Sequence, residues 1–185
     1  MLDEVKKETK SLMDKAVESL KRDFTRLRTG RASLSLLDGI RADYYGVPTP
    51  LTQMAGLSIP EGRMILIQPW DPKSSEAIEK AILKSDLGLT PQNDGKVIRI
   101  SIPPLTEERR KEQVKTVRKM TEEAKVAVRN ARRDANEMIK EYKKDGELSE
   151  DQSFKGQDDI QKLTDEFIKT MDSLAADKEK EVMEF

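Results

Sequence analysis

The sequence predicts an elongated two-domain protein of the α+β class, in which a long three-helix bundle carries a small inserted β/α/β domain. Charged residues make up 37% of the 185 positions and aromatic residues only 4%, which suits long helices that each bury a narrow apolar stripe. Apolar residues recur every three or four positions over long stretches at both ends of the chain. All eight prolines lie between Pro48 and Pro104, so the middle is predicted to form a different kind of unit.

The first helix is predicted from residue 2 to about residue 28. Its apolar positions follow the spacing of a single buried stripe. These positions are Leu2, Val5, Leu12, Ala16, Val17, Leu20, Phe24 and Leu27. Gly30 follows them, and a glycine can adopt the left-handed conformation that commonly ends a helix.

The middle segment, residues 30–105, is predicted to form a small α+β domain. Short runs rich in β-favouring residues predict strands at 40–45, 57–59, 64–68 and 97–102. In the last run an isoleucine occupies every second position, at 98, 100 and 102, which indicates a half-buried strand. Residues 74–84 predict a helix. Trp70 is predicted to fill a loop rather than to stack on a nucleic-acid base.

Two long helices are predicted next, from residue 106 to about 144 and from residue 149 onward. Thr106 can cap the first, and Ser149 with Gln152 forms the capping-box pattern at the start of the second. Apolar or small residues in the first follow alternating steps of three and four, which is the spacing of coiled-coil packing. Three amphipathic helices bury their stripes against one another, so residues 1–29 and 106–185 are predicted to form one bundle.

Two short linkers are predicted to join the inserted domain to the bundle. Gly30 and Arg31 form the first linker, and Pro103, Pro104 and Leu105 form the second. Proline restricts its own backbone and that of the preceding residue, whereas glycine permits a sharp turn. Two rigid bodies joined in this way predict a hinge whose angle can vary.

The net charge of −1 conceals two long helices of opposite charge. Residues 106–145 carry thirteen basic and nine acidic side chains, whereas residues 146–185 carry five and twelve. A basic row runs along the first of these helices, beside its apolar stripe. Its members are Lys111, Lys115, Arg118, Lys125, Arg129 and Arg132.

Arg129, Arg132 and Arg133 fall within little more than one helical turn, and we call them the arginine cluster. Like charges this close repel unless an anion lies nearby, and a planar guanidinium suits phosphate because it donates two hydrogen bonds at once. The cluster therefore predicts contact with a polyanion, best pictured as a helix face laid against the backbone of folded RNA. The competing interpretation is that charges beside a coiled-coil stripe pair with the neighbouring acidic helix.

The composition excludes several classes of function. The chain has no cysteine and no histidine, which rules out disulfides, thiol nucleophiles and Ser-His catalysis and removes the usual zinc ligands. Residues 30–39 lack the ending of a phosphate-binding loop, and the acidic residues from Asp158 onward are better explained as a solvated helix face than as a magnesium site. No catalytic residue, cofactor or metal is predicted. Neither a membrane span nor a signal peptide is recognised, so a soluble, cytoplasmic protein is expected. It is also expected to be a monomer.

Five motifs, several of them long, are spread in order along the chain. They are residues 26–32 (RLRTGRA), 44–51 (YYGVPTPL), 86–89 (DLGL), 103–110 (PPLTEERR) and 128–135 (VRNARRDA). In these motifs the chain resembles the bacterial ribosome recycling factor family. The resemblance covers essentially the whole chain, at a length typical of that family.

The resemblance implies an L-shaped protein of transfer-RNA-like dimensions, with the bundle as its long arm. It implies a function after translation termination: with elongation factor G and GTP, the family splits ribosomes into subunits and releases messenger RNA and deacylated transfer RNA. It also implies a factor without a catalytic centre. On this basis the arginine cluster is expected to contact large-subunit ribosomal RNA at the subunit interface, with Arg110 and Arg28 in support.

Two other classes of function stay open from the residues. A coiled-coil adaptor or chaperone that binds proteins would account for the helical periodicity and the high charge, although not for the arginine cluster or the inserted domain. An enzyme that uses carboxylates or a phosphate-binding loop would be expected to hydrolyse nucleotides on its own.

Overall fold

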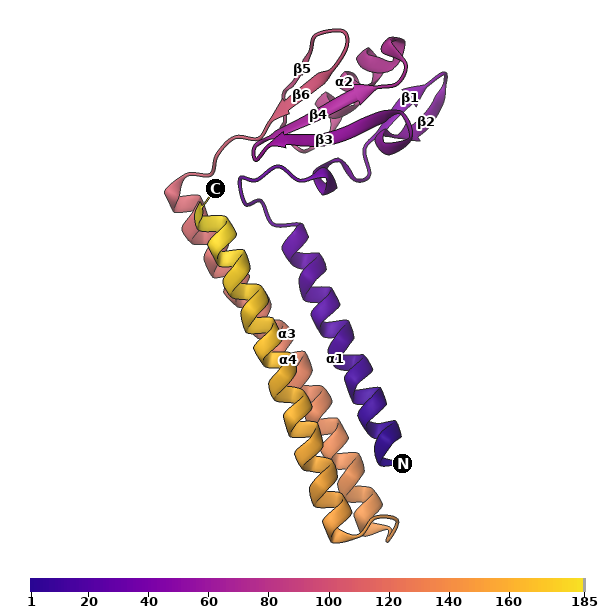
Figure 1. Cartoon of the computed structure of the whole chain (residues 1–185), viewed down its shortest axis with the longest axis vertical. Helices are drawn as coiled ribbons and strands as arrows, with labels where there is room; N and C mark the ends of the chain where they lie inside the picture. Colours follow the sequence, from indigo (N-terminus) through magenta and orange to yellow (C-terminus); the bar gives the residue numbers. More distant parts are fainter. Residues whose placement is uncertain (185) are drawn as a thin grey trace. The chain divides into compact units, whose positions relative to one another are not determined.

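The computed structural model describes residues 1–184 and divides the chain into two compact units. The first unit contains Met1–Leu27 and Glu108–Glu184, and the second contains Arg28–Glu107. A long helical bundle and a small sheet domain are both present (Figure 1), so the predicted α+β class is confirmed. The predicted bundle also included residue 185, which lies outside the described residues.

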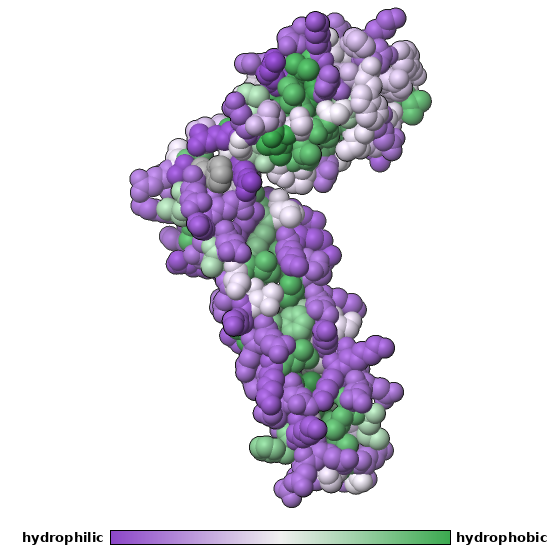
Figure 2. Space-filling model, in the orientation of Figure 1, coloured by the Kyte–Doolittle hydropathy of each residue, from purple (hydrophilic) through white to green (hydrophobic). Residues whose placement is uncertain are grey.

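The first unit is built from three helices that run side by side (Figure 1). They are α1 (Leu2–Thr25), α3 (Glu107–Lys144) and α4 (Glu150–Glu184). Apolar side chains from all three helices form its core, among them Met13, Leu20, Val117, Val128 and Met171. On the face shown in Figure 2, apolar residues form a narrow strip along the bundle between hydrophilic flanks, as the composition predicted.

Each helix of the bundle also buries one threonine. The hydroxyl groups of Thr9, Thr121 and Thr164 donate to the carbonyl oxygens four residues earlier, at 2.7 or 2.8 Å. Each hydroxyl is therefore satisfied within its own helix, and none of the three needs a partner on a neighbouring helix.

The three helices approach one another closely at Gly156 in α4. A Cβ atom placed on Gly156 would lie 2.9 Å from Leu2 Cδ2 in α1 and 3.3 Å from Ile139 Cδ1 in α3. The absence of a side chain at Gly156 is therefore what lets these two apolar side chains fill the space beside α4.

The start of α4 carries the predicted capping box. The Ser149 N–H donates to Gln152 Oε1 at 2.9 Å, and the Gln152 N–H donates to Ser149 Oγ at 3.2 Å. These reciprocal bonds satisfy backbone groups that the first turn of a helix otherwise leaves unpaired, so the start of α4 is fixed locally.

The second unit contains a two-stranded hairpin, a four-stranded sheet and one helix. The hairpin is β1 (Arg41–Tyr44) with β2 (Val47–Pro50), and the helix is α2 (Ser75–Lys84). The sheet strands are β3 (Ala55–Glu61), β4 (Met64–Pro69), β5 (Pro91–Asn93) and β6 (Ile98–Ser101). Their order is β3-β4-β6-β5 and all neighbours are antiparallel. Short 3₁₀ turns η1 (Leu34–Leu37), η2 (Leu51–Gln53) and η3 (Pro72–Ser74) lie in the connections.

One face of this sheet and α2 form the core of the second unit. Ile98 and Ile100 of β6 are fully buried beside Ile67 and Ile65 of β4, their register partners, whereas Arg99 is exposed. This alternation confirms the predicted half-buried strand. Ile78 and Ile82 of α2 belong to the same core cluster.

The prediction for Trp70 was wrong. Its side chain is 68% exposed, and only its backbone is tied down, through an N–H bond to the Met54 carbonyl at 3.1 Å. Side chains alternate between the two faces of a strand, and Ile65, Ile67 and Pro69 take the core face. Trp70 continues that alternation, so its side chain points away from the core.

Candidate nucleic-acid interface

Two members of the basic row are neutralised by α4. Arg118 forms two hydrogen bonds with Glu179, of 2.9 Å from Nε and 3.3 Å from Nη2. Lys125 Nζ lies 2.5 Å from Asp172 Oδ1, and only 12% of the Lys125 side chain is exposed. The hydrogen bond to Glu179 raises the pKa of Arg118, and the bond to Asp172 raises that of Lys125. For these two cations, pairing with the acidic helix is the correct interpretation.

The arginine cluster is not neutralised in this way. The carboxylate nearest to Arg129 is that of Glu122 on the same helix, 3.8 Å from Nη1, and 44% of the Arg129 side chain is exposed. Arg132 Nη1 donates to the neutral side chain of Gln161 in α4, at 3.2 Å. Arg133 is exposed and makes no hydrogen bond or ion pair with any residue from 1 to 184. The cluster thus keeps positive charge that no carboxylate of α4 pairs with, unlike Arg118 and Lys125, and Lys115 of the same row is also exposed.

The structure does not bring Arg110 together with the cluster. Arg110 lies near the start of α3, about 28 Å along the helix axis from Arg129. Its Nη1 donates to the Met183 carbonyl near the end of α4 at 3.2 Å, and its buried Nε has no partner among the described residues. Arg110 therefore helps to close one end of the bundle. Arg28 is exposed and falls in the second unit.

The expected hinge residues lie just inside the second unit. The units divide between residues 27 and 28 and between residues 107 and 108, so Gly30 and Arg31 follow the first boundary. Pro103 and Pro104 are exposed, Leu105 is half-buried, and all three precede the second boundary. Gly30 has φ of +79°, a left-handed conformation that strains any residue with a side chain.

Sequence reasoning missed the residues of α4 that decide which basic side chains are paired. Glu179 and Asp172 are seven residues apart, as are Asp172 and Asp165, which is the heptad spacing of a helix flank that faces another helix. That spacing was readable from the sequence. Gln161 carried no comparable pattern, because its role depends on how α3 and α4 are placed side by side.

Two further findings concern other kinds of site. In the part of the chain that the structure describes, no group of three or more carboxylate, histidine or cysteine side chains is arranged to hold a metal ion. None of the helices within residues 1–184 is long and apolar enough to cross a membrane.

Comparison with known proteins identifies the family of this chain. The sequence model of the ribosome recycling factor family matches residues 20–183. The chain belongs to the ribosome recycling factor family. The ribosome-recycling factor of Desulfatibacillum aliphaticivorans is 62% identical over 185 residues, which cover all of both chains. The factor of Syntrophus aciditrophicus (strain SB) is also 62% identical, over 184 residues and with full coverage of both chains.

Solved structures of the family share this fold. A solution structure of a ribosome recycling factor superposes with a TM-score of 0.78 at 46% identity, covering 100% of this chain and 98% of that one. A second match is one of the models of the T. thermophilus ribosome recycling factor and the E. coli elongation factor G bound to the E. coli post-termination complex. It has a TM-score of 0.65 at 47% identity and covers 98% of each chain. Family membership and fold therefore agree with the architecture derived above.

Proposed function

We propose that this chain recycles ribosomes by docking its bundle on large-subunit ribosomal RNA, near the subunit interface, through Arg129, Arg132 and Arg133. With elongation factor G and GTP, it then splits the post-termination ribosome into subunits and frees messenger RNA and deacylated transfer RNA. The observation that carries this proposal is the contrast within one helix: Arg118 and Lys125 pair with carboxylates of α4, whereas no member of the arginine cluster does, and Arg129 has only a 3.8 Å contact with Glu122 of its own helix. Phosphate is the partner that matches clustered guanidiniums.

The bundle acts as a mechanical element rather than as a catalyst. At about 1.5 Å per residue, α3 and α4 are each on the order of 50–60 Å long. Helices packed along that length resist bending, so a load applied at one end is transmitted to the other. The T. thermophilus factor has been placed with elongation factor G on a post-termination complex, which supports the same partners for this chain. We propose that the chain works as a cytoplasmic monomer without a cofactor.

Substitution of one clustered arginine tests the RNA contact. Arg132→Ala should weaken pelleting with ribosomes. It should also reduce the magnitude of the slope of log binding constant against log salt concentration, here called the salt slope, by about one, because one phosphate contact is lost. Lys119→Ala is the matched control, since Lys119 is an exposed cation on the same helix outside the cluster. The thermal midpoint of both variants should stay that of the parent. Undiminished binding of the Arg132 variant at physiological salt would contradict the proposed contact.

The inserted domain supplies the movement in this proposal, at a hinge formed by Gly30, Arg31, Pro103, Pro104 and Leu105. Gly30 has a positive φ, so Gly30→Val would strain the first linker. Sedimentation with elongation factor G and GTP should then show fewer free subunits, while ribosome binding changes less. Equal losses of binding and splitting would count against a hinge.

The two alternative classes are separated by simple assays. A protein-binding adaptor would keep its partners after ribonuclease treatment of a pull-down, whereas a ribosome-bound factor would lose them. An enzyme would hydrolyse nucleotides as an isolated chain, and we expect no hydrolysis above background.

A further inference from the structure

A groove on the second unit lies between the β1–β2 hairpin and α2. Its volume is about 540 Å³. The charged side chains that line it are Arg41, Asp43, Lys73, Glu76, Lys80 and Lys84. Four of these six are cations, so the groove is basic although residues 32–105 as a whole carry slightly more acidic than basic side chains.

None of the four cations forms an ion pair within residues 1–184, although the Asp71 carboxylate is close enough to Lys73 to attract it. Arg41, Lys73, Lys80 and Lys84 are all exposed. The acidic residues of the groove have local structural roles. Asp43 Oδ1 accepts the Gly46 N–H of the hairpin turn at 2.6 Å. Glu76 lies in the first turn of α2, where the helix dipole favours a carboxylate.

The lysines of the groove lie in a row and are not gathered around a single spot. Lys73, Lys80 and Lys84 are seven and four residues apart, which places them along one side of η3 and α2. The ten residues of α2 span about 15 Å. Small side chains, Ala77 and Ala81, lie between the lysines in the groove lining and leave it open. A row of this length suits an extended chain of phosphates better than a single anion.

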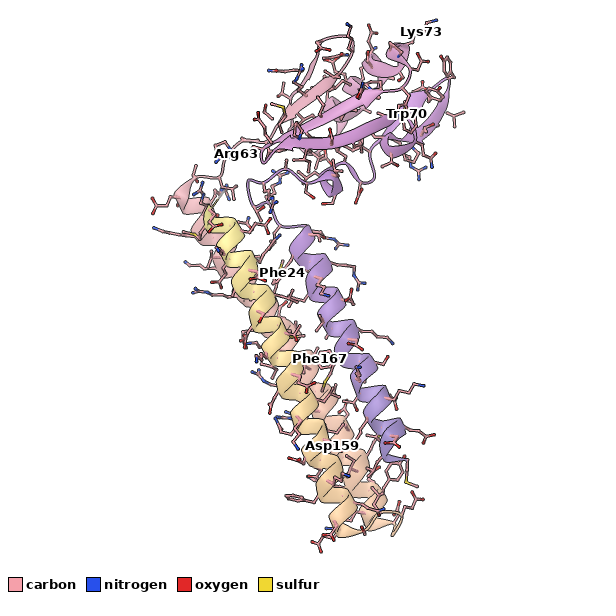
Figure 3. The ribbon with its side chains drawn as sticks, in the orientation of Figure 1. Phe24, Arg63, Trp70, Lys73, Asp159 and Phe167 are labelled. Carbon is pink, nitrogen blue, oxygen red and sulfur yellow. The ribbon has the colours of Figure 1, made fainter. Side chains whose placement is uncertain are left out.

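An exposed aromatic side chain is held close to one end of this row. The Tyr45 hydroxyl donates to Asp71 Oδ2 at 2.6 Å, and Asp71 Oδ1 accepts the Lys73 N–H at 3.0 Å. Tyr45 is 75% exposed, has φ of +51°, and packs edge-to-face with Tyr44 at a ring distance of 4.7 Å. Lys73 itself extends outward from the unit (Figure 3). A basic groove that tracks the backbone, with an aromatic ring for a base, is the arrangement that binds single-stranded nucleic acid.

We propose that this groove binds a single-stranded RNA segment, with Arg41, Lys73, Lys80 and Lys84 on its phosphates and Tyr45 stacked on a base. The inference goes beyond the proposed function, because it gives the inserted domain an RNA contact of its own. It is independent of the arginine cluster, which lies on the other unit.

The lack of cysteine makes a direct test possible. Lys80→Cys gives the chain a single thiol in the groove, and Lys96→Cys gives one on an exposed loop outside it. Each is coupled to the same photo-crosslinker and irradiated on ribosomes. The Lys80→Cys protein should crosslink to RNA several times more than the Lys96→Cys protein. Crosslinks to protein only, or equal RNA crosslinks from both, would overturn the proposal.

A binding titration separates this proposal from the previous one. The probe is a fluorescein-labelled oligouridylate, and the protein is the full chain with Arg129, Arg132 and Arg133 replaced by alanine. In that background Lys80→Ala with Lys84→Ala should reduce the magnitude of the salt slope by about 1.4, which is the loss of two phosphate contacts on a single strand. The control pair, Arg63→Ala with Lys96→Ala, should leave the slope unchanged. An unaltered slope in the Lys80/Lys84 variant refutes the groove, whatever the arginine cluster does. The cluster is tested separately by ribosome binding of Arg132→Ala.

Discussion

Arg132 of α3 lies at the heptad position opposite Asp165 of α4, yet Gln161 stands between them. The two preceding heptads pair Arg118 with Glu179 and Lys125 with Asp172, so one step of seven residues along α3 matches one step of seven back along α4. At the next step the side-chain oxygen of Gln161, Oε1, accepts from Arg132 Nη1 at 3.2 Å. The side-chain nitrogen of Gln161, Nε2, donates to Asp165 Oδ1 at 2.8 Å. A neutral side chain therefore holds the guanidinium without cancelling its charge.

Gln161→Glu should convert this neutral contact into an ion pair. We expect weaker ribosome binding and a salt slope that is shallower by up to about one, because the charge of Arg132 would be satisfied within the bundle. The measurement is pelleting with ribosomes over a range of salt concentrations. Ser173→Glu is the control, since it adds the same charge at an exposed position of α4 away from the cluster. Equal losses in both variants would mean that overall charge, rather than the Arg132 contact, sets the affinity.

Lys125→Ala should affect stability and not ribosome binding. The Lys125 side chain is 12% exposed and bonded to Asp172, so its removal should lower the free energy of unfolding by about 1 kcal/mol. Because Asp172 raises the pKa of Lys125, this contribution is fully present below the ordinary lysine pKa and is lost as the pH rises through the raised value. Urea unfolding at pH 7 and at high pH measures it. A ribosome-binding loss as large as that of Arg132→Ala would place Lys125 on RNA instead.

Gly156→Val should destabilise the bundle by about 1–3 kcal/mol. The added methyl groups would overlap Leu2 Cδ2 and Ile139 Cδ1, which already lie within van der Waals contact of a Cβ at this position. Thermal unfolding followed by helical circular dichroism measures the loss. Ala176→Val, on an exposed face of α4, controls for the lower helix propensity of valine. A loss no greater than the control's would show that the helices can move apart without cost.

Asp94→Asn should remove a pH-dependent part of the stability of the second unit. The N–H groups of Val97 and Lys96 donate to Asp94 Oδ1 at 2.8 and 2.9 Å, and they lower the pKa of this carboxyl group from 3.8 to about 2. The folded pKa is the lower one, so the contribution is complete above about pH 4 and disappears as the pH falls through 2. The urea midpoints of parent and variant, followed by fluorescence of the single tryptophan, should converge over that range. A constant difference would exclude Asp94 as its source.

The sequence predicted the helices and the buried strands well, because their periodicity is local. Ile98 and Ile100 alternate with exposed residues and identify β6 without knowledge of its neighbours. Two strands, β2 and β5, were missed because prolines interrupt them at positions 48, 50 and 91. β5 is an edge strand and β2 pairs only with β1, so each leaves one side without a strand partner where a missing N–H is tolerated.

The site was predictable only in part, because charge pairing depends on a second helix. The sequence singled out the arginine cluster, and it also showed the alternative that neighbouring cations pair with α4. The register of α3 against α4 decides which basic side chains pair with α4 and which stay unpaired with it. That register is not a local property of either helix. The prediction for Trp70 failed for a related reason: a large aromatic side chain is usually buried, whereas the end of β4 holds Trp70 outside the core.

The contact between Lys6 and Asp159 joins residues that are 153 positions apart. α1 is synthesised well before its partner α4. The nascent chain must therefore carry α1 with its apolar stripe uncovered until α4 emerges, whereas the second unit is continuous and can fold as soon as it emerges. The bundle can therefore close only after α4 has emerged, and a chain truncated within α4 would keep a folded inserted unit beside an unfinished bundle.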